Sequence, residues 1–100
     1  MKMKCQVARV IDPNGEERKV YPLNRKKFTL EELQGMVGGN IEHALLPRGN
    51  GHATMWIDEE GKLKGRAYNA KASEIYGRLP EDCIVGVAVI VTTEEVNACA

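Results

Sequence analysis

The segment "CIVGVAVIV", residues 83–91, constrains the fold more than any other part of this chain. It is the most apolar segment, and most of its side chains are β-branched. β-Branched residues favour strands, and a strand that lacks alternating polar residues is typical of one buried on both faces. The segment therefore predicts a strand at the centre of a sheet.

The first part of the chain predicts a β-hairpin over residues 4–23. Residues 4–11 include three β-branched side chains, and the turn sequence Asp12-Pro13-Asn14-Gly15 follows them. Proline fixes φ in such a turn, while asparagine and glycine tolerate positive φ. Pro22 cannot donate a ladder hydrogen bond, so the returning strand lies at a sheet edge or ends there.

The sequence "FTLEELQGMVGG" predicts a short helix over residues 30–37. Thr29 is an N-cap residue, and Glu32 lies three positions later, which is the capping-box spacing. Leucine and valine recur at helical spacing along one face. Gly38 and Gly39 end the helix, because glycine accepts the left-handed conformation found there.

Two strands are expected next, in "NIEHALL" (40–46) and "HATMWI" (52–57). The acidic turn 58–61 then leads into an exposed strand over residues 62–66. Asn69 is expected to cap a second short helix in "AKASEIYG" (70–77).

Together these elements predict one domain over residues 1–100 with the order ββ-α-ββ-α-β. The fold class is α+β: a mostly antiparallel sheet of about five strands with two short helices. A frayed C-terminal helix is an alternative for residues 92–100, with Thr92 or Thr93 as its N-cap.

The net charge is zero, because fourteen Lys and Arg balance fourteen Asp and Glu. A neutral chain has no overall field to attract polyanions, so direct nucleic-acid binding is not expected. No apolar run reaches the length of about 20 residues that crosses a bilayer, and the N-terminus has no signal-peptide core. Cytoplasmic location without membrane contact is therefore expected.

Residue types that carry catalysis or bind metals do not form a recognisable pattern. The three cysteines, Cys5, Cys83 and Cys99, have no CxxC spacing and are expected to be reduced thiols. A pair between His43 and Cys5 or Cys83 is conceivable, but nothing in the sequence brings such groups together. No catalytic residue, no metal site and no cofactor are predicted.

Two surfaces remain as candidate binding sites. The first consists of Trp56 with Lys62, Lys64 and Arg66, since alternate cations on a strand would make one face positive beside an aromatic ring. The second is the loop "PRGNGH", which would bind an anion through backbone N–H groups. Its candidate ligand-binding residues are Arg48, Gly49, Gly51 and His52.

Three segments of the chain carry a family resemblance: "TLEELQGMVGGNIEHALL", "WIDEEGKLKGRAYNAKAS" and "DCIVGVAVIV". In this order they resemble a family of small domains of unknown function from bacteriophages and other mobile elements. The matching pattern is LxxLQxxVGGxIE, DEEGKLxGxxxN and DxIxGxAVIV. It covers residues 4–91.

The resemblance implies a phage- or prophage-encoded accessory protein in the bacterial cytoplasm. We expect such a protein to act without catalysis, by binding a host protein or protein complex and inhibiting a defence system such as a CRISPR complex. The alternative is a homo-oligomer that sequesters a nucleotide through the loop 47–52. A homodimer is compatible with either function, because an open strand edge can pair with a second copy.

Overall fold

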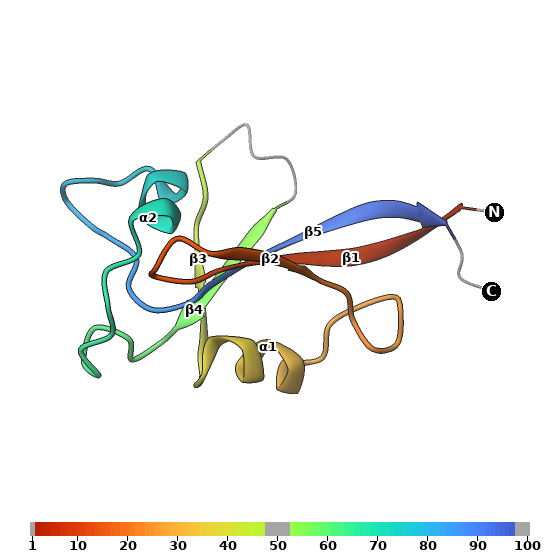
Figure 1. The fold of residues 1–100 in the computed structure, drawn as a ribbon, viewed down its shortest axis with the longest axis horizontal. Helices are drawn as coiled ribbons and strands as arrows, with labels where there is room; N and C mark the ends of the chain where they lie inside the picture. The colour runs from red at the N-terminus through yellow and green to blue at the C-terminus, as the bar shows by residue number, and fades with distance from the viewer. Residues whose placement is uncertain (1, 48–52, 98–100) are drawn as a thin grey trace.

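The computed structural model describes residues 2–47 and 53–97, with only the backbone described for residues 96 and 97. Its elements, in chain order, are β1 (Lys2–Ile11), β2 (Glu17–Val20), α1 (Leu30–Val37), β3 (Ile41–Ala44), β4 (Thr54–Asp58), α2 (Ala70–Tyr76) and β5 (Ala88–Asn97) (Figure 1). The α+β class and the order ββ-α-ββ-α-β are as predicted.

All five strands form one antiparallel sheet in the order β2-β1-β5-β4-β3. The strand β5 lies at the centre, which confirms the prediction from its apolar sequence. It pairs along its whole length with β1, from Ala88 opposite Ile11 to Asn97 opposite Lys2. The β1–β5 pair extends beyond the other strands, and its far end is the pair formed by Lys2 and Asn97 (Figure 1).

The two helices cover opposite faces of the sheet (Figure 1). Alternate residues of β5 contribute to two cores, with Ala88 and Ile90 facing α2 and Val89 and Val91 facing α1. The buried core on the α2 face consists of Ile11, Ala44, Met55, Ala72, Ile84, Ala88 and Ile90. The buried core on the α1 face consists of Ala8, Val10, Leu33, Val37, Val89 and Val91.

The capping box predicted for α1 is present. The Thr29 hydroxyl accepts a hydrogen bond from the Glu32 backbone N–H at 3.1 Å, and the Glu32 carboxylate accepts one from the Thr29 N–H at 2.9 Å. Gly38 ends the helix with a φ of 87°. These contacts satisfy backbone groups that the helix ends leave unpaired.

The prediction for the C-terminal residues was wrong. Residues 92–97 continue β5 instead of forming a frayed helix. Their backbone pairs with residues 2–7 of β1, and this non-local partner outweighs the weak local helix signal. The strand also begins at Ala88 and not at residue 83.

The strand predicted over residues 62–66 is also absent, since residues 59–65 form consecutive turns. Backbone hydrogen bonds run from the Lys64 N–H to the Glu60 carbonyl (2.9 Å) and from the Arg66 N–H to the Gly61 carbonyl (3.0 Å). Gly65 has a φ of 68°, which glycine adopts without strain. We call residues 59–66 the β4–α2 loop.

None of the helices in the described residues is long and apolar enough to cross a membrane.

Candidate functional site

The carboxylate of Asp58 is the centre of an ion cluster at the end of β4. Its Oδ2 atom accepts hydrogen bonds from Lys64 Nζ at 2.9 Å and from Arg66 Nε at 2.7 Å, while Oδ1 accepts one from the Glu60 backbone N–H at 2.8 Å. The Asp58 side chain is only 1% exposed, whereas Lys64 and Arg66 are 39% and 31% exposed. Two cations therefore share one buried acid, and the cluster keeps one positive charge.

The environment of Asp58 favours its ionised form. Burial is the largest single influence and raises its pKa, but the hydrogen bonds from Lys64, the Glu60 N–H and Arg66 together outweigh it. The pKa falls from 3.8 to about 2. The carboxylate is therefore charged at every physiological pH and fixes the β4–α2 loop to the sheet.

Arg66 also joins this loop to the end of α1, by donating a hydrogen bond to the Gly38 carbonyl at 2.9 Å. Two glycines leave room for the cationic side chains. A Cβ atom on Gly39 would lie 2.8 Å from Lys64 Nζ, and one on Gly86 would lie 2.7 Å from Arg66 Cδ. The backbone of three separate segments thus closes around the ion cluster.

Asn69 caps α2, as predicted, and makes a second set of contacts that the sequence did not reveal. Its Oδ1 accepts a hydrogen bond from the Ala72 N–H at 3.0 Å. Its fully buried Nδ2 donates to the carbonyls of Ile11 and Gly86, both at 2.9 Å. Asn69 therefore ties α2 to the end of β1 and to the segment before β5.

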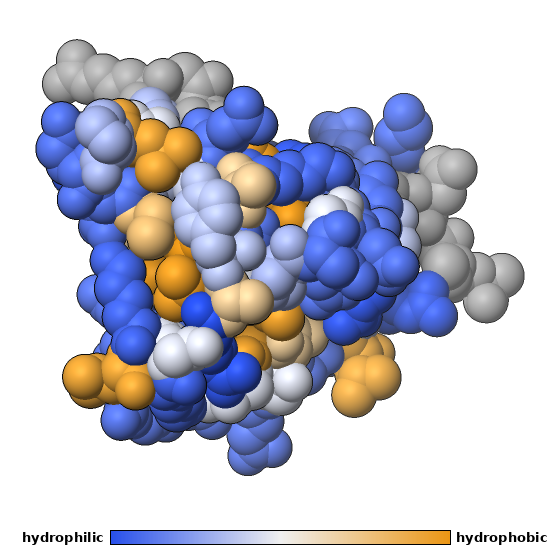
Figure 2. Space-filling model, turned by 60° about the vertical axis from the view of Figure 1, so that its left-hand side comes forward, coloured by the Kyte–Doolittle hydropathy of each residue, from blue (hydrophilic) through white to orange (hydrophobic). Residues whose placement is uncertain are grey.

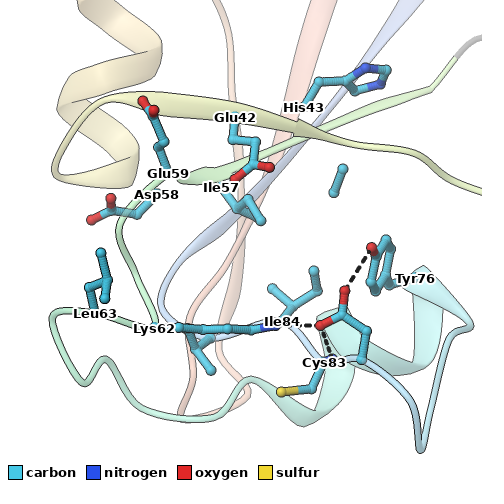
Figure 3. A pocket seen from close by; sticks show the side chains of 13 residues that line it. Glu42, His43, Ile57, Asp58, Glu59, Lys62, Leu63, Tyr76, Cys83 and Ile84 are labelled. Atoms are coloured by element: carbon cyan, nitrogen blue, oxygen red, sulfur yellow. Dashed lines mark hydrogen bonds and ion pairs between the residues drawn. The ribbon is translucent and has the colours of Figure 1, made fainter.

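A pocket of about 170 Å³ lies between β3, the β4–α2 loop and α2 (Figure 3). Lys62 extends toward the α2 side and forms an ion pair with Asp82, which also accepts a hydrogen bond from the Tyr76 hydroxyl at 3.2 Å. The hydrogen bond from Lys62 is the main cause that lowers the pKa of Asp82, and it raises the pKa of Lys62 itself. Lys62 is therefore directed away from the Asp58 cluster.

His43 and Cys83 both line this pocket, but they do not form a catalytic pair. Figure 3 shows the His43 ring at one end, turned away from the pocket, and Cys83 at the other. The His43 ring instead contacts the Trp56 ring, with centroids 5.6 Å apart. Cys5 is buried within β1. Among the described residues, no group of three or more His, Cys, Asp or Glu is placed to hold a metal ion.

The structure brings three of the four residues of the first candidate surface to one face of the molecule. Trp56 and Asp58 are two residues apart on β4 and share the α1 face, so Lys64 and Arg66, bound to Asp58, lie on this side. Lys62 does not join them. The residues of the second candidate surface, Arg48, Gly49, Gly51 and His52, lie outside the described residues.

Sequence reasoning missed the role of Asp58, which it assigned to a solvated turn. One signal was present in the sequence. Asp58 lies two residues after Trp56, so on a strand the two side chains share one face, and cations follow at positions 64 and 66. A buried carboxylate needs such partners.

The segments that carry the family resemblance meet at the Asp58 cluster and beside it. "VGG" supplies Gly38 and Gly39, "DEEGKLKGRAYN" supplies Asp58 and Asn69, and "DCIVG" supplies Gly86. In this chain the three segments therefore form one structural junction.

No curated protein and no solved structure showed significant similarity to the chain. The model of a domain of unknown function, DUF3846, matches residues 3–99. This match covers almost the whole sequence, and the chain therefore belongs to the DUF3846 family.

Proposed function

We propose that this domain is a non-enzymatic binding module, encoded by a phage or prophage, that acts by occupying a host protein or protein complex. Inhibition of a bacterial defence system, such as a CRISPR complex, is the proposed outcome. The phage setting is supported by the resemblance of the three sequence segments. The mode of action is supported by the surface around Trp56.

The observation that carries this proposal is an aromatic pair beside partly exposed cations. Trp56 is half-buried and contacts the exposed ring of His43, and Lys64 and Arg66 lie near the same face with one uncompensated charge. Tryptophan and arginine are the residue types that contribute most to interface affinity. A partner with an acidic and partly apolar surface would complement this face.

An exposed leucine in the same loop adds apolar surface. Leu63, next to Lys64, is 87% exposed. Figure 2 shows that apolar residues reach the surface at this end of the molecule, between hydrophilic ones. We call Trp56, His43, Leu63, Lys64 and Arg66 the β4 surface.

The test uses variants of side chains that are exposed or half-buried on the β4 surface and that form no ion pair among the described residues. His43→Ala and Leu63→Ala change exposed residues, and each is expected to weaken binding to the host protein that co-purifies with the tagged chain. Trp56→Ala is expected to weaken it by about tenfold or more. Leu23→Ala is the matched control, because Leu23 is 89% exposed beyond β2, at the opposite edge of the sheet.

Lys64 and Arg66 are unsuitable for this test, since their loss would leave the buried Asp58 carboxylate short of partners and destabilise the fold. Binding is measured by titrating each folded variant with the purified host protein. Equal affinities for wild type, Trp56→Ala, His43→Ala and Leu63→Ala would refute the assignment of the β4 surface.

A further inference from the structure

A second pocket lies on the α1 face of the sheet, in the first half of β1, and none of the residues that line it is acidic. It has a volume of about 280 Å³ and is lined by Lys4, Cys5, Gln6, Lys26, Lys27 and Thr93. It shares no residue with the β4 surface.

The segment 24–28, which supplies two of these lysines, is fixed against β1. The Gln6 N–H donates to the Lys26 carbonyl at 2.9 Å, and the Phe28 N–H donates to Gln6 Oε1 at 2.7 Å. Asn24 Oδ1 accepts hydrogen bonds from the N–H groups of Lys26 and Lys27 at 2.9 and 3.0 Å. In Figure 1 the loop that follows β2 lies alongside the extended half of β1 and β5. Hydrogen bonds therefore hold the backbone of Lys26 and Lys27 in place.

The positive charge of this pocket comes from its three lysines. No ion pair of the described residues involves Lys4, Lys26 or Lys27, although the ion pairs include six other cations: Arg9, Lys19, Lys62, Lys64, Arg66 and Lys71. The acid in register with Lys4 is Glu95 of β5, which is exposed and does not line the pocket. A neutral chain thus concentrates positive charge at one place.

We propose that this pocket, the phosphate pocket, binds a phosphate group. The residues that line it carry hydrogen-bond donors: three ammonium groups, the Gln6 amide nitrogen, whose oxygen is already bonded to Phe28, and the Thr93 hydroxyl. A phosphate offers only acceptor oxygens and a negative charge, which is the complement of such a set. Free phosphorylated small molecules and the backbone of a nucleic acid share this chemistry.

The experiment is calorimetric titration of the full chain with three probes: inorganic pyrophosphate, ATP and a short oligothymidylate. Combined Lys26→Gln and Lys27→Gln is expected to weaken binding by about tenfold or more, because charge-assisted hydrogen bonds are lost. Glu95→Gln is expected to tighten binding by removing a nearby negative charge.

The matched control is Arg18→Gln. Arg18 is exposed and pairs in register with Val10, six residues beyond Lys4, which places it about 20 Å along the strand. The substitution Arg18→Gln removes positive charge from the same face of the sheet, and we expect it to change the affinity for the probes by less than about twofold.

The probes separate the two sources of phosphate. Binding of pyrophosphate and ATP that depends on Lys26 and Lys27 supports a free phosphorylated ligand. Oligothymidylate binding with the same dependence, and with a steep loss of affinity as salt rises, supports a nucleic-acid backbone. Absence of binding for all three probes at millimolar concentration overturns the proposal. An equal loss of binding in Arg18→Gln also overturns it.

Discussion

Replacing Asp58 with asparagine is expected to destabilise the fold without changing its shape. Asparagine fits the same space, and its carbonyl oxygen can still accept the hydrogen bond from the Glu60 N–H. The substitution removes the charge that Lys64 and Arg66 share. The loss is therefore electrostatic and leaves the backbone of the β4–α2 loop unstrained.

The size of the effect follows from the pKa of Asp58. A fall from 3.8 to about 2 corresponds to about 2 kcal/mol of stability at neutral pH. Removing one member of a fully buried ion pair costs about 3–5 kcal/mol. Lys64 and Arg66 are partly solvated. We therefore expect Asp58→Asn to lower the free energy of unfolding by the amount that follows from the pKa, and not by the cost of breaking a fully buried pair.

The pH dependence has a definite direction. A carboxylate whose pKa is lower in the folded state contributes stability above its unfolded pKa and loses it as pH falls toward the folded value. Wild type should therefore lose the contribution of Asp58 between about pH 4 and pH 2, whereas Asp58→Asn has no such contribution to lose. The difference in the free energy of unfolding between wild type and Asp58→Asn should therefore become smaller between about pH 4 and pH 2.

Urea denaturation followed by tryptophan fluorescence measures this directly, because Trp56 is the single tryptophan and lies two residues from Asp58. Glu59→Gln, which removes an exposed neighbouring carboxylate, is the matched control and should stay within about 0.5 kcal/mol of wild type. A cost below about 0.5 kcal/mol for Asp58→Asn at pH 7 would contradict the proposed role of the cluster. A difference that stays constant from pH 5 to about pH 2 would do the same.

Two further variants test the junction around the cluster. Gly39→Ala is expected to cost about 1–3 kcal/mol, because the new methyl group would displace Lys64 Nζ, 2.8 Å from its position. Asn69→Ala is expected to cost about 2–4 kcal/mol, since it removes the α2 cap and leaves the buried Gly86 carbonyl without this donor. Asn40→Ala, an exposed asparagine, should change the unfolding free energy by less than about 0.5 kcal/mol; an equal cost at both asparagines would refute the junction.

Local signals predicted the elements whose causes are local. The capping box at Thr29 and Glu32, the turn after β1 and the cap at Asn69 depend on residues within a few positions, and all three are present. The central strand was predictable because a run of β-branched apolar residues has few other stable positions in a small domain.

Long-range contacts explain the failures. Lys62, Lys64 and Arg66 alternate like a strand, but Asp82 and Asp58 fix their side chains and the backbone turns instead. The polar residues 92–97 lack a strand pattern of their own and become a strand because β1 pairs with them. Sequence spacing does not reveal which distant carboxylate a cation will bind.

The candidate site was predictable only as a list of residue types. The sequence indicated Trp56 and nearby cations as a surface, but not that His43 would contact the Trp56 ring or that Lys62 would turn toward α2. The phosphate pocket had one sequence signal, the basic run "NRKK" at 24–27, whereas Lys4 comes from the strand β1.

Native mass spectrometry of the tagged protein, purified gently from bacterial cells that express it, tests whether the domain occupies a host macromolecule. We expect a complex with one host protein or assembly, and we expect Trp56→Ala to lose that complex while Leu23→Ala retains it. The chain alone, with no bound protein in the wild type, would contradict the claim that this domain acts by occupying a host macromolecule.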